Sequence, residues 1–176
     1  CLSNPILAYS KSQAKCIPAE KNFVACEILA KHGDNEALLI LGHFYEIGAG
    51  IEKNTEKAEE IYQHLADKND ADGINQLAIL KEEQGKQEEA ILLYQRAIEL
   101  GSSSANYNLG LLYKHNKNYS KAKEMFEIAI KNDNSSNAMM SLGDLYRHGN
   151  DVEKNMELAE KWYKASIQSG NHFAIT

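Results

Sequence analysis

A leucine followed by a glycine or an alanine returns along the chain at nearly constant intervals of 36, 32 and 33 residues. The four copies of this pair begin at Leu41, Leu77, Leu109 and Leu142. An aromatic residue stands four positions after the leucine in three copies, and Lys81 stands there in the second. A period of this length predicts a stack of similar supersecondary units, each of which buries its apolar face against its neighbours.

A second set of marks follows each pair, with an alanine, then an aromatic residue four positions on, then a third residue three positions further. The trios are Ala58–Tyr62–Leu65, Ala90–Tyr94–Ala97, Ala122–Phe126–Ala129 and Ala159–Tyr163–Ser166. Offsets of four and three place each trio on one stripe of a helix. The small residue lets a neighbouring helix approach, and the aromatic ring fills the space one turn on. Because the chain has only two prolines, Pro5 and Pro18, and many good helix formers, stacked helix hairpins are predicted.

These marks resemble the tetratricopeptide repeat, whose period is about 34 residues. The second and third copies have thirteen residues from the leucine to the first alanine, which matches that repeat, whereas the first and fourth have seventeen. The four extra residues fall in the turns at 48–53 and 149–154, and this longer turn resembles that of the Sel1-like repeat. The resemblance implies an all-α fold: an α-α superhelix, or right-handed solenoid of antiparallel helix hairpins, with about four full repeats and a degenerate N-terminal hairpin.

The resemblance also divides the chain into segments. We expect an N-terminal tether and capping hairpin at 1–34, a Sel1-like repeat at 35–70, tetratricopeptide-like repeats at 71–102 and 103–134, and a Sel1-like repeat with the C-terminal end at 135–176. The expected helix pairs are 35–47 with 55–68, 71–84 with 87–99, 103–115 with 119–131, and 136–147 with 155–169. The N-terminal hairpin would pair 5–15 with 19–31.

The charge of the chain narrows the class of partner. A net charge of −6 argues against nucleic-acid binding, which needs a basic face toward the phosphates. Residues 35–102 carry fourteen acidic and six basic side chains, whereas 103–134 carry three acidic and five basic. This imbalance suits a cationic partner, although a solvated helix face gives the same composition. No apolar run is long enough to span a membrane.

The three cysteines bear on the compartment. Cys16 and Cys26 would lie on the two legs of the N-terminal hairpin, and Sel1-like proteins of bacterial envelopes often carry such bridges. The resemblance therefore implies a disulfide between them and an oxidising compartment, whereas in a reducing cytosol both would be small buried thiols. Cys1 resembles the lipid-carrying first residue of a mature bacterial lipoprotein; the alternative is an accident of cloning or numbering. We expect a periplasmic protein that is anchored to the outer membrane if Cys1 carries a lipid.

Motifs of catalysis are nearly absent from the sequence. It contains no His-Glu-x-x-His, Cys-x-x-Cys or Gly-x-Ser-x-Gly, and its six histidines have no cysteine or carboxylate at ligand spacing. We therefore expect no enzyme, no cofactor and no metal site. A hydrolase that acts through His43 and Glu46 is a remote alternative, because no set of nucleophile, base and orienting group accompanies them.

The resemblance places a protein-binding groove along the first helix of each hairpin. Its side chains are expected five and two positions before the repeat leucine, and two, five and six positions after it. The residues selected are Glu36, Leu39, His43, Glu46, Ile47, Asp72, Asn75, Ile79, Glu82, Glu83, Tyr107, Leu111, Lys114, His115, Met140, Asp144, Arg147 and His148. Five of them form an apolar stripe rimmed by charge, which is typical of a recognition surface, although the same stripe could pack between first helices.

Similar proteins suggest what this groove would do. The leading hypothesis is a non-catalytic module of the bacterial envelope that holds another protein as an adaptor or as an assembly or regulatory factor. A sharper alternative is an immunity protein that neutralises an antibacterial effector of a type VI secretion system. A third is a cytosolic scaffold with free thiols. In each case the partner is a protein, and a membrane would be reached only through a lipid on Cys1.

Overall fold

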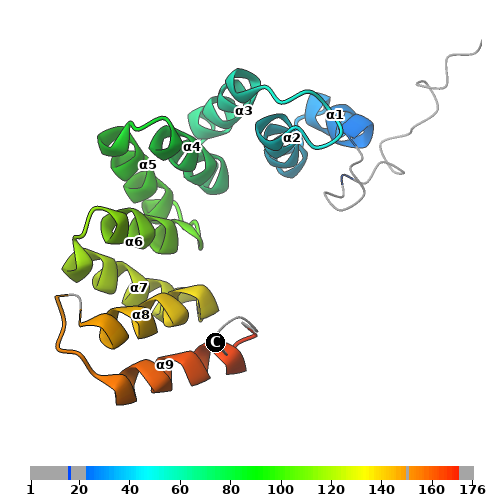
Figure 1. Ribbon diagram of the computed structural model, residues 1–176. Coiled ribbons are helices and arrows are strands. Elements are labelled where there is room, and N and C mark those ends of the chain that lie inside the picture. Colours follow the sequence, from blue (N-terminus) through cyan, green and yellow to red (C-terminus); the bar gives the residue numbers. More distant parts are fainter. Residues whose placement is uncertain (1–15, 17–22, 150, 171–176) are drawn as a thin grey trace, which may run out of the picture. The chain divides into compact units, whose positions relative to one another are not determined.

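The computed structural model describes residues 16, 23–149 and 151–170. Within these residues there are nine α-helices and no strand (Figure 1). The helices are α1 (Phe23–Lys31), α2 (Asn35–Ile47), α3 (Thr55–Asp67), α4 (Ala71–Glu83), α5 (Gln87–Glu99), α6 (Ala105–His115), α7 (Tyr119–Asp133), α8 (Ser136–His148) and α9 (Met156–Gln168). The predicted all-α chain of helix hairpins is confirmed. No described helix has the length and apolar character needed to cross a bilayer.

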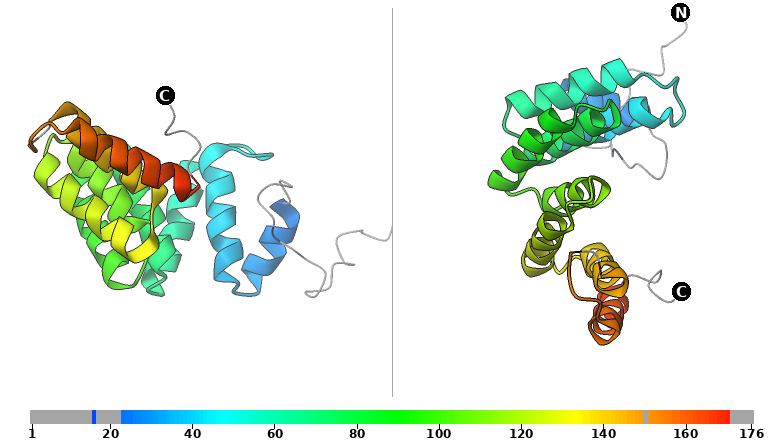
Figure 2. Two further views of the ribbon diagram at one scale, coloured as in Figure 1. Left: turned by 90° about the horizontal axis from the view of Figure 1, so that it is seen from below. Right: turned by 60° about the vertical axis from the view of Figure 1, so that its left-hand side comes forward.

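The chain divides into two compact units, residues 1–77 and 78–176, with the boundary inside α4. In the first unit, α2 packs against α1 on one side and α3 on the other. In the second unit, α6 pairs with α7 and α8 with α9, and α7 also contacts α8 (Figure 2). The second helix of the predicted N-terminal hairpin is present as α1, and its predicted first helix at 5–15 lies outside the described residues.

The repeat marks form the contact between the two helices of a hairpin. In the first unit, a methyl group added to Gly42 would collide with the ring of Tyr62. In the second unit, a Cβ at Gly110 would lie 2.6 Å from the Phe126 ring. The glycine of each such pair is therefore the residue that allows the aromatic ring of the second helix to lie directly on the first helix.

The turns of the two Sel1-like repeats close in the same way. Gly48 and Gly149 end α2 and α8 with φ of 75° and 74°, a left-handed conformation that suits glycine. The backbone N–H of Asn54 then donates to the carbonyl of Tyr45 at 2.7 Å, and that of Asn155 donates to the carbonyl of Tyr146 at 3.0 Å. Each asparagine side chain also caps the next helix by accepting from the backbone N–H three residues on.

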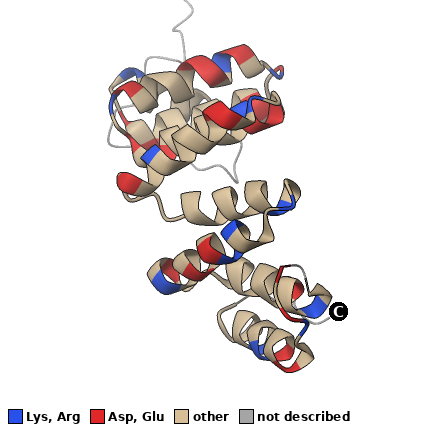
Figure 3. Ribbon diagram, turned by 90° about the vertical axis from the view of Figure 1, so that its left-hand side faces the viewer, with Lys and Arg blue, Asp and Glu red and all other residues tan. Residues whose placement is uncertain are grey.

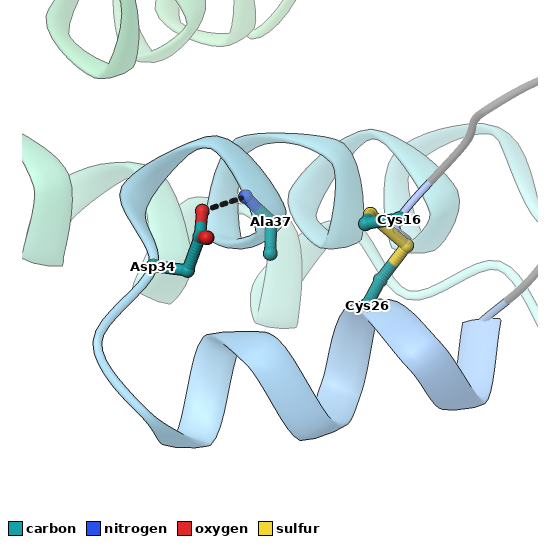
Figure 4. Close-up of a disulfide and its surroundings, with 4 residues drawn as sticks. All are labelled: Cys16, Cys26, Asp34 and Ala37. Carbon is teal, nitrogen blue, oxygen red and sulfur yellow. Dashed lines mark hydrogen bonds between the residues drawn. A yellow bond between two sulfur atoms is a disulfide. The ribbon is translucent and has the colours of Figure 1, made fainter. Parts of the chain in front are cut away.

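A disulfide joins Cys16 to Cys26 in the first unit, with a Cα–Cα distance of 4.6 Å (Figure 4). Cys26 is fully buried in α1, and Phe23 of the same helix meets Tyr45 of α2 edge to face at 5.7 Å. Asp34 caps α2 by accepting from the backbone N–H of Ala37 at 3.0 Å. The pairing of the two cysteines that the resemblance implied is present in the structure.

We expect Gly143→Ala to lower the free energy of unfolding by about 1–3 kcal/mol, although alanine favours a helix more than glycine does. The added Cβ would lie 2.6 Å from the ring of Tyr163, which must then move away from α8. Urea denaturation of the variant checks this loss. The second substitution Tyr163→Leu should make room, so the double variant should lose less than the sum of the two single losses; additive losses would contradict the proposed contact.

Candidate protein-binding surface

The first helix of the first repeat, α2, presents a carboxylate held by a buried tyrosine. The ring of Tyr62 is fully buried, but its hydroxyl donates a hydrogen bond to Glu46 Oε2 at 2.8 Å. The same oxygen lies 3.4 Å from Nδ1 of His43, which is exposed on the surface. Glu46 is therefore held in place at the surface by the Tyr62 hydroxyl, and the imidazole of His43 lies beside it.

The same arrangement recurs in the second unit. Tyr94 is 1% exposed, and its hydroxyl donates to Glu82 Oε2 at 3.0 Å. Burial, followed by the charge of Glu82 and the hydrogen bond to it, raises the pKa of Tyr94 far above its ordinary value. The other oxygen of Glu82 lies 3.8 Å from Nδ1 of His115 in α6. A carboxylate held by tyrosine and flanked by histidine thus appears once in each unit.

A third pair joins α8 and α9 of the second unit. The hydroxyl of Tyr163 donates to Asp144 Oδ1 at 2.8 Å, and Lys114 of α6 lies 3.6 Å from the other oxygen of Asp144. Burial and the bond to Asp144 raise the pKa of Tyr163, and Arg147 acts in the opposite direction. Charged side chains of both signs therefore lie along the helices of this unit (Figure 3), and several hold one another in place.

The third repeat departs from this arrangement in two positions at once. Phe126 replaces the tyrosine, so there is no hydroxyl, and Lys114 stands five residues after the repeat leucine, where the first two repeats have Glu46 and Glu82. The first two repeats therefore combine a carboxylate at this offset with a tyrosine, and the third combines a lysine with a phenylalanine. The fourth repeat differs from both, because it has Arg147 at this offset and its tyrosine holds Asp144, two residues after the leucine. Treating the repeat tyrosines as core residues alone misses the second role of their hydroxyl groups. This joint change of two positions is the signal that could have revealed it.

Nearly all the residues predicted for partner binding reach the surface. Leu39, Glu46, Ile79, Glu82, Tyr107, Leu111, Lys114, Met140 and Asp144 are half-buried, and Glu36, His43, Ile47, Asp72, Glu83, His115, Arg147 and His148 are exposed. The prediction is wrong for Asn75. This residue is enclosed by packing and only 2% exposed, so it offers no surface to a partner. That the others bind a partner stays a prediction.

The structure brings several of these residues together between α6 and α8 of the second unit. Lys114, His115, Asp144 and His148 line one shallow pocket of about 390 Å³, with Lys117 and Tyr119 at its edge. Two members of the predicted apolar stripe, Tyr107 and Leu111, pack in part against the buried cluster formed around Phe126. The rings of Tyr107 and Phe126 lie 5.9 Å apart. We call the eight predicted residues of these two helices the α6–α8 surface: Tyr107, Leu111, Lys114, His115, Met140, Asp144, Arg147 and His148.

The arrangement is suited to recognition. The carboxylates of Glu46, Glu82 and Asp144 are held by hydroxyl donors, and a preorganised charged group loses little side-chain freedom when a partner binds.

Among the described residues, no group of three or more His, Cys, Asp or Glu side chains is placed to hold a metal ion. His43 and Glu46 lie together, but the Glu46 oxygen nearest His43 already accepts the Tyr62 hydroxyl.

We expect the free energy of unfolding to fall as the pH rises above about 10, and we expect this fall to be smaller in Tyr94→Phe. A raised pKa means that the folded state holds the Tyr94 proton at a pH where the unfolded chain releases it. The contribution is complete below the ordinary value of 10 and is lost above it, at up to about 1.4 kcal/mol per pH unit. Urea denaturation at a series of pH values measures the slope. At neutral pH the same variant should lose about 1–2 kcal/mol, because Glu82 loses a donor.

Tyr146→Phe is the control for this experiment, since the Tyr146 hydroxyl makes no hydrogen bond with any described residue. Its stability should follow that of the natural chain between pH 9 and pH 11, values that bracket the ordinary tyrosine pKa of about 10. Equal slopes for Tyr94→Phe and the natural chain would contradict the role given to the Tyr94 hydroxyl.

Comparison with solved structures shows the same fold in several bacterial proteins. A Sel1 repeat protein from Oxalobacter formigenes matches with a TM-score of 0.73 and 24% identity, over 97% of this chain and 78% of that one. A protective antigen of uropathogenic Escherichia coli with an SLR fold matches with a TM-score of 0.70 and 28% identity, over 86% of this chain but only 34% of the antigen. An immunity protein from Pseudomonas aeruginosa matches with a TM-score of 0.67 and 23% identity, over 91% of this chain and 62% of that one.

No curated protein matches the chain. Family models, however, match along most of it. The tetratricopeptide repeat model matches residues 103–136, the third repeat. The Sel1 repeat model matches residues 35–70, 75–102 and 136–171, and so includes the second repeat, whose turn has the tetratricopeptide length. Such repeats are in general non-catalytic scaffolds for protein interaction. Since its matches cover more than half of the sequence, the chain belongs to the Sel1 repeat family.

Proposed function

We propose that this protein is a non-catalytic binding module that holds another protein against the first helices of its hairpins. The observation that carries the proposal is the set of surface carboxylates that accept a hydrogen bond from a tyrosine of the following helix, Glu46 from Tyr62, Glu82 from Tyr94 and Asp144 from Tyr163. A scaffold needs only the tyrosine rings. Their hydroxyl groups add a defined position for charge at the surface, and a binding partner can use this.

The α6–α8 surface is the part of the second unit that we expect to bind. It combines partly accessible apolar groups, Tyr107, Leu111 and Met140, with the cations Lys114 and Arg147 and the carboxylate of Asp144. An apolar centre with a polar margin is the usual anatomy of a protein interface. In the first unit, the corresponding residues on α2 are Leu39 and Ile47 with His43 and Glu46.

Site-specific photo-crosslinking in the natural host tests this proposal. A photoreactive amino acid at Leu111 or Met140 should give one discrete crosslinked product that contains a second protein. The matched control is the same amino acid at Glu160, an exposed position on α9, which should give none. Products that form from Glu160 but from neither Leu111 nor Met140 would show that the partner binds elsewhere.

Neutralisation of an antibacterial effector is a second candidate function. The immunity protein of Pseudomonas aeruginosa shares the fold over 91% of this chain, and at 23% identity the likeness extends to the fold alone. An immunity protein must bind its effector one to one and tightly, with a dissociation constant of about 1 nM or below. Co-expression with an effector encoded beside it should restore growth, and Asp144→Arg should abolish the rescue. An adaptor would leave growth unchanged in both cases.

We also propose that the protein works in the bacterial periplasm, tethered through a lipid on Cys1. The Cys16–Cys26 disulfide supports an oxidising compartment, because glutathione and thioredoxin keep such pairs reduced in the cytosol. Intact-mass measurement of the natural protein tests both parts of the proposal. We expect a first residue that is cysteine and carries acyl chains, together with the mass of one disulfide. An unmodified chain with free thiols, recovered from the cytosolic fraction, would overturn the placement.

A further inference from the structure

A cavity of about 460 Å³ opens on the side of the second unit that is lined by α5, α6 and α7. Ile98 of α5 and Met125 and Ile128 of α7 form much of its apolar wall, and Glu99 and Glu124 lie at its margin. None of the residues predicted for partner binding belongs to it. A volume of this size is enough for one or two large side chains of another molecule.

One wall of the cavity contains a buried polar residue at a position that is apolar in the other repeats. Three residues before the repeat leucine stand Leu38, Ile74 and Met139 in the first, second and fourth repeats. The third repeat has Asn106 there, and Asn106 is only 3% exposed. Leucine would suit this position by the logic of the repeat. An asparagine in its place costs stability unless something satisfies its amide.

Within the described part of the chain, nothing satisfies that amide. The Asn106 side chain makes no hydrogen bond with any described residue. Every side-chain nitrogen or oxygen that is fully enclosed among these residues has a hydrogen-bond partner. Since the amide of Asn106 has none, it is not fully enclosed, and the small exposed area of the residue belongs in part to this amide. It keeps that area where it lines the cavity. An almost fully buried amide at the wall of a cavity is a hydrogen-bonding group that a ligand in the cavity can satisfy.

The next hairpin shows which side chain the fold accepts at the place of Met125 in the cavity wall. Met125 stands three residues after the repeat alanine of α7, and Trp162 stands at the same place in α9. Trp162 packs against the buried cluster that α7 and α8 form. The larger ring is therefore compatible with the repeat, and the choice of the smaller, flexible methionine leaves space in the third repeat.

The charges at the margin indicate the chemistry of the occupant. Glu99 and Glu124 are exposed and have no ion-pair partner among the described residues. Lys121 also lines the cavity, and its ammonium lies over the ring of Tyr113 at 5.2 Å from the centroid. Two carboxylates without partners beside an apolar cavity favour a ligand with an apolar group next to a positive charge.

We infer that this cavity is a second binding site, which takes a polypeptide segment of a protein partner through one large apolar side chain and an adjacent lysine or arginine. The apolar side chain lies against Ile98, Met125 and Ile128, and the cation meets Glu99 and Glu124. The Asn106 amide can donate and accept at once, which matches the N–H and C=O of a peptide backbone. The site is independent of the first-helix surface proposed above.

Selection from a library of random short peptides displayed on phage tests this inference. The library is first depleted on Met125→Trp, in which the ring fills the cavity, and the remainder is selected on the natural chain. We expect peptides that share an apolar residue beside a lysine or arginine. Their affinity, measured as isolated peptides by isothermal titration, should fall about tenfold or more on Met125→Trp and on Asn106→Leu.

Two further variants test the charges, with a matched control. Glu99→Gln combined with Glu124→Gln should weaken the same peptides about two- to fivefold and reduce the dependence of binding on salt. Glu127→Gln makes the same change on an exposed part of α7 outside the cavity and should have no effect. Peptides without a cation, or with equal affinity for the natural chain and Met125→Trp, would overturn the inference.

The melting temperature separates a binding residue from a structural one. Asn106→Leu restores the apolar residue of the first repeat, so it should raise the melting temperature by about 2–4 °C while it weakens peptide binding about tenfold or more. A fall in melting temperature with binding intact would show that Asn106 supports the fold instead. Self-association of the natural chain that Met125→Trp removes, seen by sedimentation, would replace the proposed partner with a second copy and so overturn the inference as well.

Discussion

Replacement of Phe126 by alanine is expected to lower the free energy of unfolding by about 3–5 kcal/mol, the largest loss that we predict for a single substitution. The ring is fully buried and lies at the centre of a cluster that includes Ala138 and Leu142 of the following helix. It also rests on Gly110 of its own hairpin and meets the ring of Tyr107 at 5.9 Å. Removal of the ring therefore opens a cavity that two hairpins share and that neither can close alone.

Equilibrium unfolding in urea measures this loss, with Phe126→Leu as the conservative variant. Leucine keeps most of the apolar volume and should lose about half as much as alanine. The alanine variant should also tolerate Gly110→Ala, because the ring that a new Cβ would meet is gone. A loss below about 1 kcal/mol for Phe126→Ala would show that the cluster collapses freely around the gap, which a close-packed hairpin stack should not do.

Loss of the Cys16–Cys26 bridge is expected to have the second largest effect, about 2–3 kcal/mol. The bridge joins residues ten positions apart and restricts the unfolded chain at the end of the first unit. The variant with both cysteines changed to alanine keeps small apolar side chains, which suits Cys26 because it is fully buried. We expect the loss to be concentrated in α1. Hydrogen exchange of its backbone amides should be faster in the variant than in the natural chain, and the increase should be larger than in α7.

A reducing agent provides the control for this prediction. Dithiothreitol should destabilise the natural chain by the same amount and leave the double alanine variant unchanged. If the natural chain is equally stable with and without the reductant, while its thiols titrate as free, then α1 is held by its packing on α2 and the bridge is dispensable.

The sequence predicted the hairpins well because the marks that recur are themselves the contacts between helices. In the first, third and fourth repeats, the glycine and the aromatic residue stand at fixed offsets because the ring lies where a Cβ of the glycine would be. Helix ends were less accurate: α6 begins at Ala105 instead of 103, since the preceding serines form a turn in which Ser102 is buried. The period of the repeat marks predicts where a helix lies, whereas its first residue depends on local hydrogen bonds.

The offsets from the repeat leucine predicted most of the accessible residues of the candidate surface. The wrong prediction, Asn75, has a physical cause. The rule selects the residue two positions before the leucine, which is accessible in Tyr107 but buried in Asn75. The offset of a residue from the repeat leucine predicts the helix face on which it lies, whereas its burial depends on the side chains that pack over it. Asn106 escaped the rule because it occupies a core position, and it stands out only when the same position is compared across all four repeats.

The longer turns of the first and fourth repeats are each tied back to the helix they leave, through the pair Tyr45 and Asn54 or the pair Tyr146 and Asn155. Each of these hydrogen bonds closes a local loop between the two helices of its own hairpin. Connections of two lengths can therefore coexist in one array. A turn of one length can therefore be exchanged for the other, or enlarged into a new contact element, without a change in the helix that it leaves.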